Sequence, residues 1–145
     1  MKIAIANDHN GVNIKTMLKK YLEELGYEVL DFGSNTSESV DYPNYAFKVG
    51  KSVANKESDL GILICGTGIG MSIACNKVKG VRCAKVYNLE EAILSKQHNN
   101  ANVIALSSHL SESDLKEITK AFIETNFSNE ERHIRRNNLI DNYNG

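Results

Sequence analysis

One stretch of the chain places a thiol directly before a glycine-rich turn. Cys65 follows the apolar run 60–64, and the next five residues are Gly-Thr-Gly-Ile-Gly. A buried strand that opens onto a helix in this way leaves unpaired backbone N–H groups at the helix start, where an anion can bind. The positive end of the helix favours the thiolate form of a nearby cysteine. We therefore expect Cys65 to serve as a base or nucleophile beside an oxyanion site, although a small buried cysteine in a packing turn fits the same residues.

The spacing of the glycines and cysteines argues against familiar nucleotide and metal sites. Gly66, Gly68 and Gly70 give GxGxG rather than the dinucleotide pattern GxGxxG, and the phosphate loop GxxxxGK[ST] does not occur. The three cysteines form no CxxC pair and have no histidine at zinc-ligand spacing, so no metal is predicted. Cys75 and Cys83 are expected in the core.

Other polar residues could take part in chemistry or could be ordinary loop residues. Asp8 and His9 could form an acid/base and anion-binding pair, and Tyr42 could be a hydrogen-bonding lid residue or a packing aromatic. His98 and Asn99 could donate to sugar hydroxyls, although this composition is also typical of a helix C-terminus.

Two arginines near the end of the chain have helical spacing. Arg132 and Arg136 are four residues apart, so they share one face of a helix and could converge on a phosphate. Most pairs of this kind are solvated surface charge. The residues alone do not distinguish a phosphate-binding pair from solvated surface charge.

Composition bounds the class of protein. The 145 residues suit a single domain, 1–145, and the net charge of −1 gives no reason to expect nucleic acid or a membrane as partner. No apolar run approaches a membrane span, and an odd number of cysteines without a secretory leader predicts a reducing, cytoplasmic setting.

Strand-like and helix-like patterns alternate along the chain. Strands are predicted at 2–6, 27–32, 60–64, 81–86 and 102–106, with helices following each. Expected helix starts are Asn10 as an N-cap, Pro43, Ser111 with Asp114, and Ser128 with Glu131. The third helix is expected at 69–78 and the fourth at 89–97. The alternation predicts an α/β fold: a doubly wound, Rossmann-like, five-stranded parallel sheet with helices on both faces.

The predicted topology separates the candidate residues into two groups. Ligands collect at the carboxyl ends of the strands in such sheets, which selects Asp8 and His9, the turn 65–70, and residues 107–109. His98 and its neighbours precede the fifth strand and so lie at the opposite edge. If they are functional, a second subunit is expected to deliver them to Cys65.

Several motifs in fixed order resemble the ribose-5-phosphate isomerase B family, part of a larger group that includes galactose-6-phosphate isomerase subunits. They are KIAIANDHNG at 2–11, VDYP at 40–43, CGTGIGMSIACNKVKGVR at 65–82, HNNANVIAL at 98–106 and RHIRR at 132–136. The resemblance spans the whole chain. It implies reversible isomerisation of ribose 5-phosphate and ribulose 5-phosphate through an enediolate, with no metal or organic cofactor.

The resemblance also implies roles for individual residues. Cys65 is the expected base, Thr67 assists proton movement, and the oxyanion site consists of the backbone N–H groups of Gly66, Thr67, Gly68, Ile69 and Gly70. His98 is expected to open the sugar ring, with Asp8 and Tyr42 on sugar oxygens and Asn99 on the enediolate or a hydroxyl. The phosphate contacts would be His9, Arg132 and Arg136. The family is a homodimer whose sites are built from both subunits; whether dimers pair further is left open.

The sequence departs from the family pattern at three positions. His109 stands where arginine is common, so we expect a weaker phosphate contact whose affinity falls as pH rises through the histidine titration. Asn10 is bulkier than the small residue often found there. Cys75 replaces the usual alanine, and because some relatives use a glutamate at that position as base, the absence of a carboxylate favours the Cys65 mechanism.

Other functions remain open on the sequence. The same chemistry could act on a six-carbon phosphate such as allose or galactose 6-phosphate. A two-subunit galactose arrangement is less favoured, because this one chain retains Cys65, His98 and both arginines. A non-catalytic phosphate-binding module would need only the glycine-rich turn and the arginines.

Overall fold

The computed structural model describes residues 1–145 and contains five strands and six helices. The strands are β1 (Lys2–Asn7), β2 (Glu28–Asp31), β3 (Leu60–Cys65), β4 (Cys83–Lys85) and β5 (Val103–Ser107). The helices are α1 (Val12–Glu24), α2 (Tyr42–Ala54), α3 (Ile69–Cys75), α4 (Leu89–Gln97), α5 (Glu112–Glu124) and α6 (Glu131–Asp141). All strands are parallel, in the order β2-β1-β3-β5-β4. The predicted doubly wound α/β sheet is confirmed.

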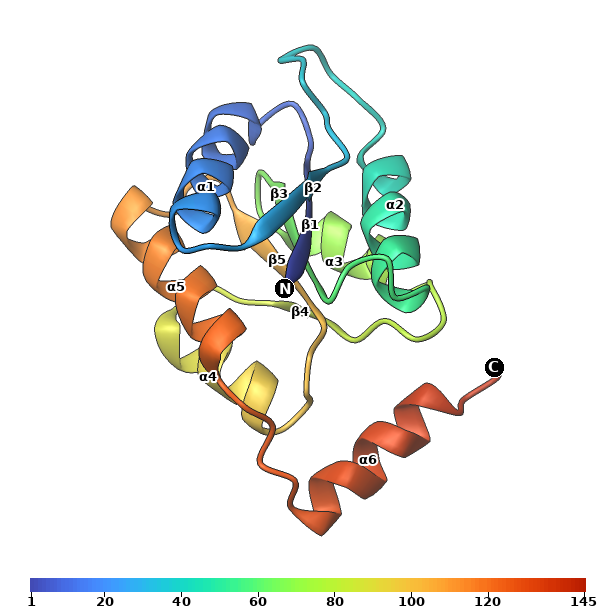
Figure 1. Cartoon of the computed structure of the whole chain (residues 1–145). Helices are drawn as coiled ribbons and strands as arrows, with labels where there is room; N and C mark the ends of the chain where they lie inside the picture. Colours follow the sequence, from blue (N-terminus) through green and yellow to red (C-terminus); the bar gives the residue numbers. More distant parts are fainter.

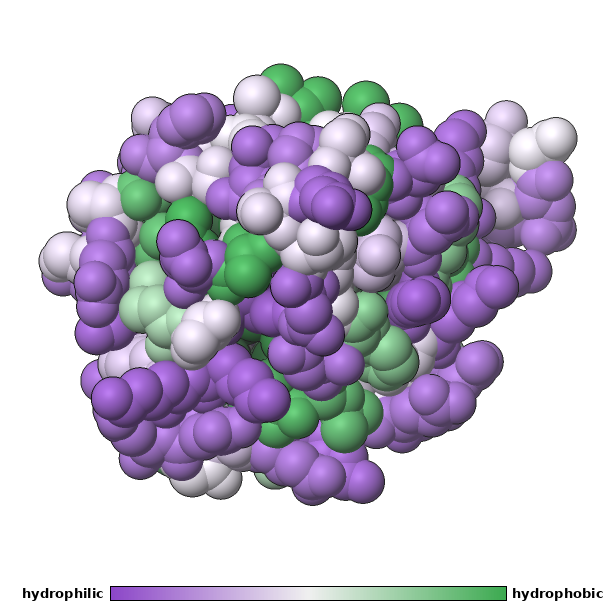
Figure 2. Space-filling view, turned by 90° about the horizontal axis from the view of Figure 1, so that it is seen from above, coloured by the Kyte–Doolittle hydropathy of each residue, from purple (hydrophilic) through white to green (hydrophobic).

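Helices cover both faces of the sheet (Figure 1). Helices α1, α4 and α5 lie on one face and α2 and α3 on the other, while α6 extends away from the sheet, beyond the amino ends of the strands. Seen from above, the surface is mostly hydrophilic with separate hydrophobic patches (Figure 2). No helix combines the length and apolar character needed to cross a membrane.

Alternation along each strand divides the core into two clusters. In β1, Ile3 and Ile5 face the cluster under α1 and α5, whereas Ala4 and Ala6 face α2 and α3. Small residues on the second face let its helices approach closely: a Cβ added at Gly61 would lie 2.6 Å from the side chain of Val49 in α2. This tight layer holds β3, and therefore Cys65, in place.

The edge strands and one helix are shorter than the sequence predicts. Strands β2 and β4 each pair with one neighbour only, which limits their regular length. Helix α3 ends at Cys75, not near residue 78. The side chain of Asn76 bonds both backbone groups of Cys83, at 2.8 and 2.9 Å, and so turns the chain toward β4. Cys75 is buried and Cys83 half-buried, close to the expectation.

Two of the four predicted helix starts are wrong. Helix α1 begins after Gly11, and the Asn10 side chain contacts Asp8 instead of capping the helix. Helix α6 begins after Glu130, because Asn129 adopts φ +58° and adds a turn before it. Ser111 caps α5 through the backbone N–H of Asp114, and Pro43 lies in the first turn of α2, as predicted.

Candidate active site

Cys65 ends β3 at the point where the glycine-rich turn begins. Its side chain is buried, and its sulfur accepts a hydrogen bond from the backbone N–H of Gly68 at 3.0 Å. A donor directed at sulfur stabilises negative charge on it. The arrangement therefore suits a thiolate that removes a proton from a bound molecule.

The turn fits closely against two neighbouring elements. Gly68 has φ +82°, and a Cβ at this position would lie 3.2 Å from the backbone of Ala105 in β5. Gly70 lies under the ring of Tyr42, where an added Cβ would be 2.7 Å from the hydroxyl oxygen. Tyr42, considered from sequence as a lid residue, thus lies against the first turn of α3.

Two of the five N–H groups predicted for the oxyanion site already have acceptors within the chain. The N–H of Gly68 donates to Cys65, and that of Ile69 donates to the Thr67 hydroxyl at 3.1 Å. The N–H groups of Gly66, Thr67 and Gly70 are not engaged by these two bonds. They are the donors of this turn that a bound anion can use without displacing either contact.

Asp8 and His9 lie at the same edge of the sheet, after β1. The backbone N–H of Asp8 donates to the carbonyl of Ile64, the residue before Cys65, at 3.0 Å. Its buried carboxylate accepts from the backbone N–H of Asn10 at 2.8 Å. The ring Nδ1 of His9 is buried with no partner. An unpaired buried imidazole nitrogen beside the turn fits a residue that meets a polar ligand.

The segment after β5 closes the other side of the turn. The backbone N–H of Ser108 donates to the carbonyl of Cys65 at 2.9 Å, and the Ser107 hydroxyl donates to that of Gly66 at 2.8 Å. Ser107 also accepts from the backbone N–H of His109. His109 is exposed. This histidine therefore lies beside the glycine-rich turn, as the topology predicts.

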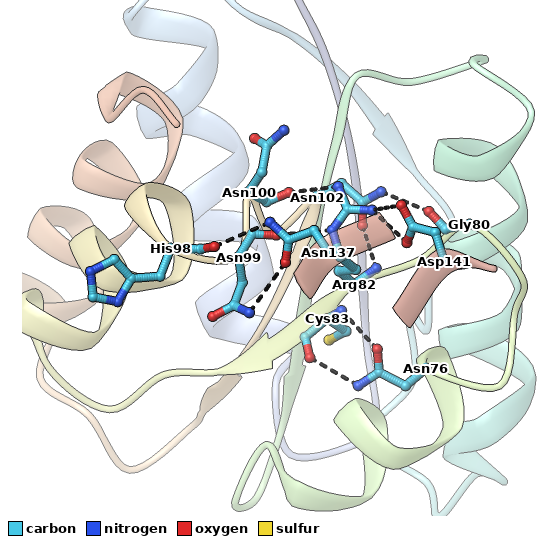
Figure 3. A network of polar contacts seen from close by, with 10 residues as sticks. All are labelled: Asn76, Gly80, Arg82, Cys83, His98, Asn99, Asn100, Asn102, Asn137 and Asp141. Carbon is cyan, nitrogen blue, oxygen red and sulfur yellow. Dashed lines mark hydrogen bonds and ion pairs between the residues drawn. The ribbon is translucent and has the colours of Figure 1, made fainter. Parts of the chain in front are cut away.

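A second group of candidate residues surrounds the end of α4 (Figure 3). Asn137 of α6 donates to the carbonyl of His98 at 3.1 Å, and the Asn99 side chain bonds that of Asn137 at 3.4 Å. Arg82 donates to the carbonyls of Asn99 and Asn100. The imidazole of His98 points away from this network, and the residue is exposed.

Arg82 also anchors α6 to the rest of the chain. Its Nη1 atom contacts both carboxylate oxygens of Asp141, at 2.6 and 2.7 Å, while its Nη2 and Nε atoms donate to the backbone. Charge-assisted contacts of this kind are stronger than neutral ones. The hollow between α6 and the segment 76–84 has a volume of about 710 Å³, and neither Cys65 nor the glycine-rich turn lines it.

The two predicted phosphate-binding arginines lie on α6 and are exposed. Arg132 makes an ion pair with Glu130 at 3.2 Å, and its Nε donates to the ring of His133 at 3.4 Å. Arg136 is one turn further along. Both arginines belong to the His98 group and not to the Cys65 group.

The two groups lie at opposite edges of the sheet, as the sequence predicts. Cys65 pairs with Ser107 at the end of β5, whereas His98 and Asn99 precede its first residue, Val103. The length of β5 alone separates the two edges by about 13 Å. A molecule that contacts both Cys65 and the His98 group of the same chain would have to reach across this distance.

Three residues around His98 were not singled out from the sequence. They are His133, Asn137 and Asp141, each four residues after the one before. His133 and Asn137 contact His98, and Asp141 pairs with Arg82, which holds the segment after His98. The spacing places them on one face of α6. Because the three residues are polar and differ in type, apolar periodicity in the sequence does not reveal their spacing. No group of three or more His, Cys, Asp or Glu side chains could hold a metal ion.

Comparison with known proteins gives consistent results. The model of the ribose/galactose isomerase family matches residues 3–140. Ribose-5-phosphate isomerase B of Escherichia coli is 48% identical over 109 residues, which are 75% of this chain and 73% of that protein.

Two solved structures are similar over almost the whole chain. The ribose 5-phosphate isomerase of Thermotoga maritima has a TM-score of 0.94 and 44% identity, with 98% of both chains covered. Ribose-5-phosphate isomerase B of Mycoplasma genitalium, solved with bound ribulose-5-phosphate, has a TM-score of 0.93 and 43% identity, covering 98% of this chain and 95% of that one.

Proposed function

Because the chain belongs to the ribose/galactose isomerase family and is a sugar-phosphate isomerase, we propose that it interconverts ribose 5-phosphate and ribulose 5-phosphate through a cis-enediolate. Cys65 is the base. The observation that supports this role most directly is the Gly68 N–H that donates to its sulfur.

The isomerisation moves one proton between neighbouring carbons. The Cys65 thiolate removes the proton from C2 of the open-chain aldose, and the electron pair forms the enediolate while negative charge develops on oxygen. The free N–H groups of Gly66, Thr67 and Gly70 stabilise this oxyanion. The Thr67 hydroxyl assists proton exchange between the two oxygens. The cysteine then returns its proton to C1, which yields the ketose and restores the thiolate.

The ring of the aldose must open before this proton transfer. His98 donates a proton to the ring oxygen, while Asp8 accepts from a sugar hydroxyl with help from Tyr42. Asn99 bonds the enediolate or a neighbouring hydroxyl. Both oxygens of the Asp8 carboxylate accept from Asn10, which fixes the orientation of the carboxylate. The phosphate is bound by His9 and His109 of one chain and Arg132 and Arg136 of another.

The separation of the two groups supports a homodimer with shared sites. Within one chain the strand β5 stands between Cys65 and His98. Beside the glycine-rich turn, α3 exposes Ile69 and Ile73, at 54% and 60%. Apolar side chains one helical turn apart and open to water are suited to an interface. In the proposed homodimer this face takes part in an isologous contact, and each shared site combines Cys65 of one chain with His98 of the other.

A direct assay tests the reaction and its substrate. Purified, metal-free protein is incubated with ribose 5-phosphate or allose 6-phosphate, and ketose formation is followed beside the Cys65→Ala variant. Conversion of the pentose that is lost in the variant supports the proposal. Activity on the hexose alone would change the substrate, and no activity on either would favour a phosphate-binding module. Robust turnover by the variant would contradict the role of Cys65.

Complementation tests whether two chains build one site. Cys65→Ala and His98→Asn are each expected to be inactive, whereas co-refolded mixtures should recover about a quarter of wild-type activity, because half the dimers carry one intact site of two. A mixture that stays inactive would place both residues of each site on one chain.

A further inference from the structure

His133 is a buried histidine directly beneath the exposed His98. It lies on α6, is only 5% exposed, and its ring centroid is 4.4 Å from that of His98 with an interplanar angle of 38°. The two imidazoles therefore pack against each other, with the exposed ring of His98 lying on the buried ring of His133.

Both ring nitrogens of His133 have partners, and these partners define its charge. The Nδ1 atom lies 2.9 Å from the hydroxyl oxygen of Ser128, and Nε2 accepts from Nε of Arg132 at 3.4 Å. A guanidinium can only donate, so Nε2 must carry a lone pair and Nδ1 the hydrogen. This arrangement requires the neutral imidazole.

The surrounding charges act in the same direction. Burial lowers the pKa of His133 most, followed by the charges of His98, Arg132 and Arg136, while Glu130 raises the pKa. The net effect is a lowered pKa. A protonated His133 would also have to give up the hydrogen bond from Arg132.

The contacts that hold His133 also hold His98. Ser128 donates its backbone N–H to the carbonyl of Gln97, the residue before His98, at 3.1 Å. Asn137, one turn after His133, donates to the carbonyl of His98 itself. Helix α6 thus fixes the backbone of His98 through one side chain and its ring through another.

We propose that His133 is a positioning residue for His98: a neutral imidazole, held by Ser128 and Arg132, that fixes the orientation of the His98 ring and leaves it free to take up a proton. This inference rests on the proposed function, in which His98 donates that proton to the sugar. Neutrality matters because a cation packed against His98 would oppose its protonation.

Histidine NMR tests the contact independently of activity. The chain has four histidines, so each ring signal in ¹⁵N-labelled protein can be assigned by single substitutions. The His98 titration midpoint should be unchanged in His133→Phe and should fall by about one pH unit in His133→Lys, where a like charge is introduced. A midpoint that rises in His133→Phe would show that His133 is charged, and an unchanged midpoint in His133→Lys would show that the rings do not interact. Either result overturns the proposal.

Kinetics test the positioning role. His133→Ala should lower kcat about tenfold to a hundredfold with little change in KM, because a misplaced proton donor affects the reaction more than binding. His133→Phe, which keeps a flat ring beneath His98, should recover part of this loss. The matched control is Asn138→Ala, at an exposed position of α6, which should behave as wild type.

The kinetic and NMR results distinguish a failure of the positioning role of His133 from a failure of the proposed function. A folded His133→Ala variant with wild-type kcat, or one with a raised KM alone, would overturn the positioning role. If the wild-type protein failed to isomerise sugar phosphates, the proposed function would fail, and the NMR titrations would still decide whether a neutral His133 supports His98.

Discussion

Replacing Gly68 by alanine tests both the packing of the glycine-rich turn and its contact with Cys65. Gly68 adopts φ +82°, and an added Cβ would meet backbone atoms of Ala105 and Leu106 at 3.2 Å. Gly26 provides a matched control, since its φ is +93° and an added Cβ there would meet nothing within 4 Å. The two variants share the backbone penalty, and only Gly68→Ala adds the crowding.

The expected losses of stability differ for this reason. Alanine in the left-handed region costs about 1 kcal/mol, which is the whole effect expected for Gly26→Ala. Crowding against a strand backbone that cannot move adds about 1 to 3 kcal/mol in Gly68→Ala. The entropy of unfolding of a chain of this length is about 0.3 kcal/mol per kelvin, so Tm should fall by about 3 °C for Gly26→Ala and by about 10 °C for Gly68→Ala.

Turnover provides the second measurement. Relief of the crowding moves the Gly68 N–H away from the Cys65 sulfur, which it now meets at 3.0 Å. Loss of one such donor to a charged reacting group lowers kcat about a hundredfold. Thermal unfolding at equal protein concentration and ketose formation below Tm are measured for both variants. Equal Tm values for the two would refute the packing argument, and wild-type turnover in folded Gly68→Ala would refute the role of the N–H.

Three further predictions follow from other contacts. Substrate KM should rise in His109→Ala and fall in His109→Arg, measured by initial rates; an unchanged KM in both variants would contradict a phosphate contact. The pKa of Cys83 is raised mainly by a hydrogen bond with Cys75 and next by burial. Brief alkylation at pH 8 should therefore leave Cys83 unmodified, as measured by mass spectrometry. Rapid labelling of Cys83 would contradict this prediction. Lys15→Met should lower the free energy of unfolding in urea by about 1 to 3 kcal/mol, because the buried Ser34 carbonyl loses its donor at 2.9 Å and Asp31 its partner at 3.1 Å; an unchanged free energy would show that these contacts contribute little.

Much of the fold could be predicted because its signals are local. Alternation of strand and helix patterns identified all five strands, and α4 was predicted with its observed bounds. Ser111 caps α5 because a serine hydroxyl reaches an N–H three residues ahead whatever the rest of the chain does. Ser128 has the same local pattern, but its hydroxyl accepts from the backbone N–H of Glu130 and lies 2.9 Å from Nδ1 of His133, so it does not cap the helix, which begins after Glu130.

The candidate site could be predicted in part for the same reason. The thiol, the glycine-rich turn and the strand-end residues Asp8 and His109 lie at one edge because parallel strands bring their carboxyl ends together. The sequence predicts Asn10 as an N-cap and shows only that it is bulkier than the residue often found there, whereas the tertiary structure places its side chain against the Asp8 carboxylate.

The sequence by itself determined the order of the elements, the parallel sheet, the family and the placement of Cys65 and His98 at opposite edges, because these depend on periodicity and on motifs read within short windows. Only the tertiary structure decided how α6 docks. The ion pair of Arg82 with Asp141 joins residues 59 apart in the chain. The packing of His133 on His98 follows from that docking, and no local pattern encodes a contact between side chains so distant in sequence.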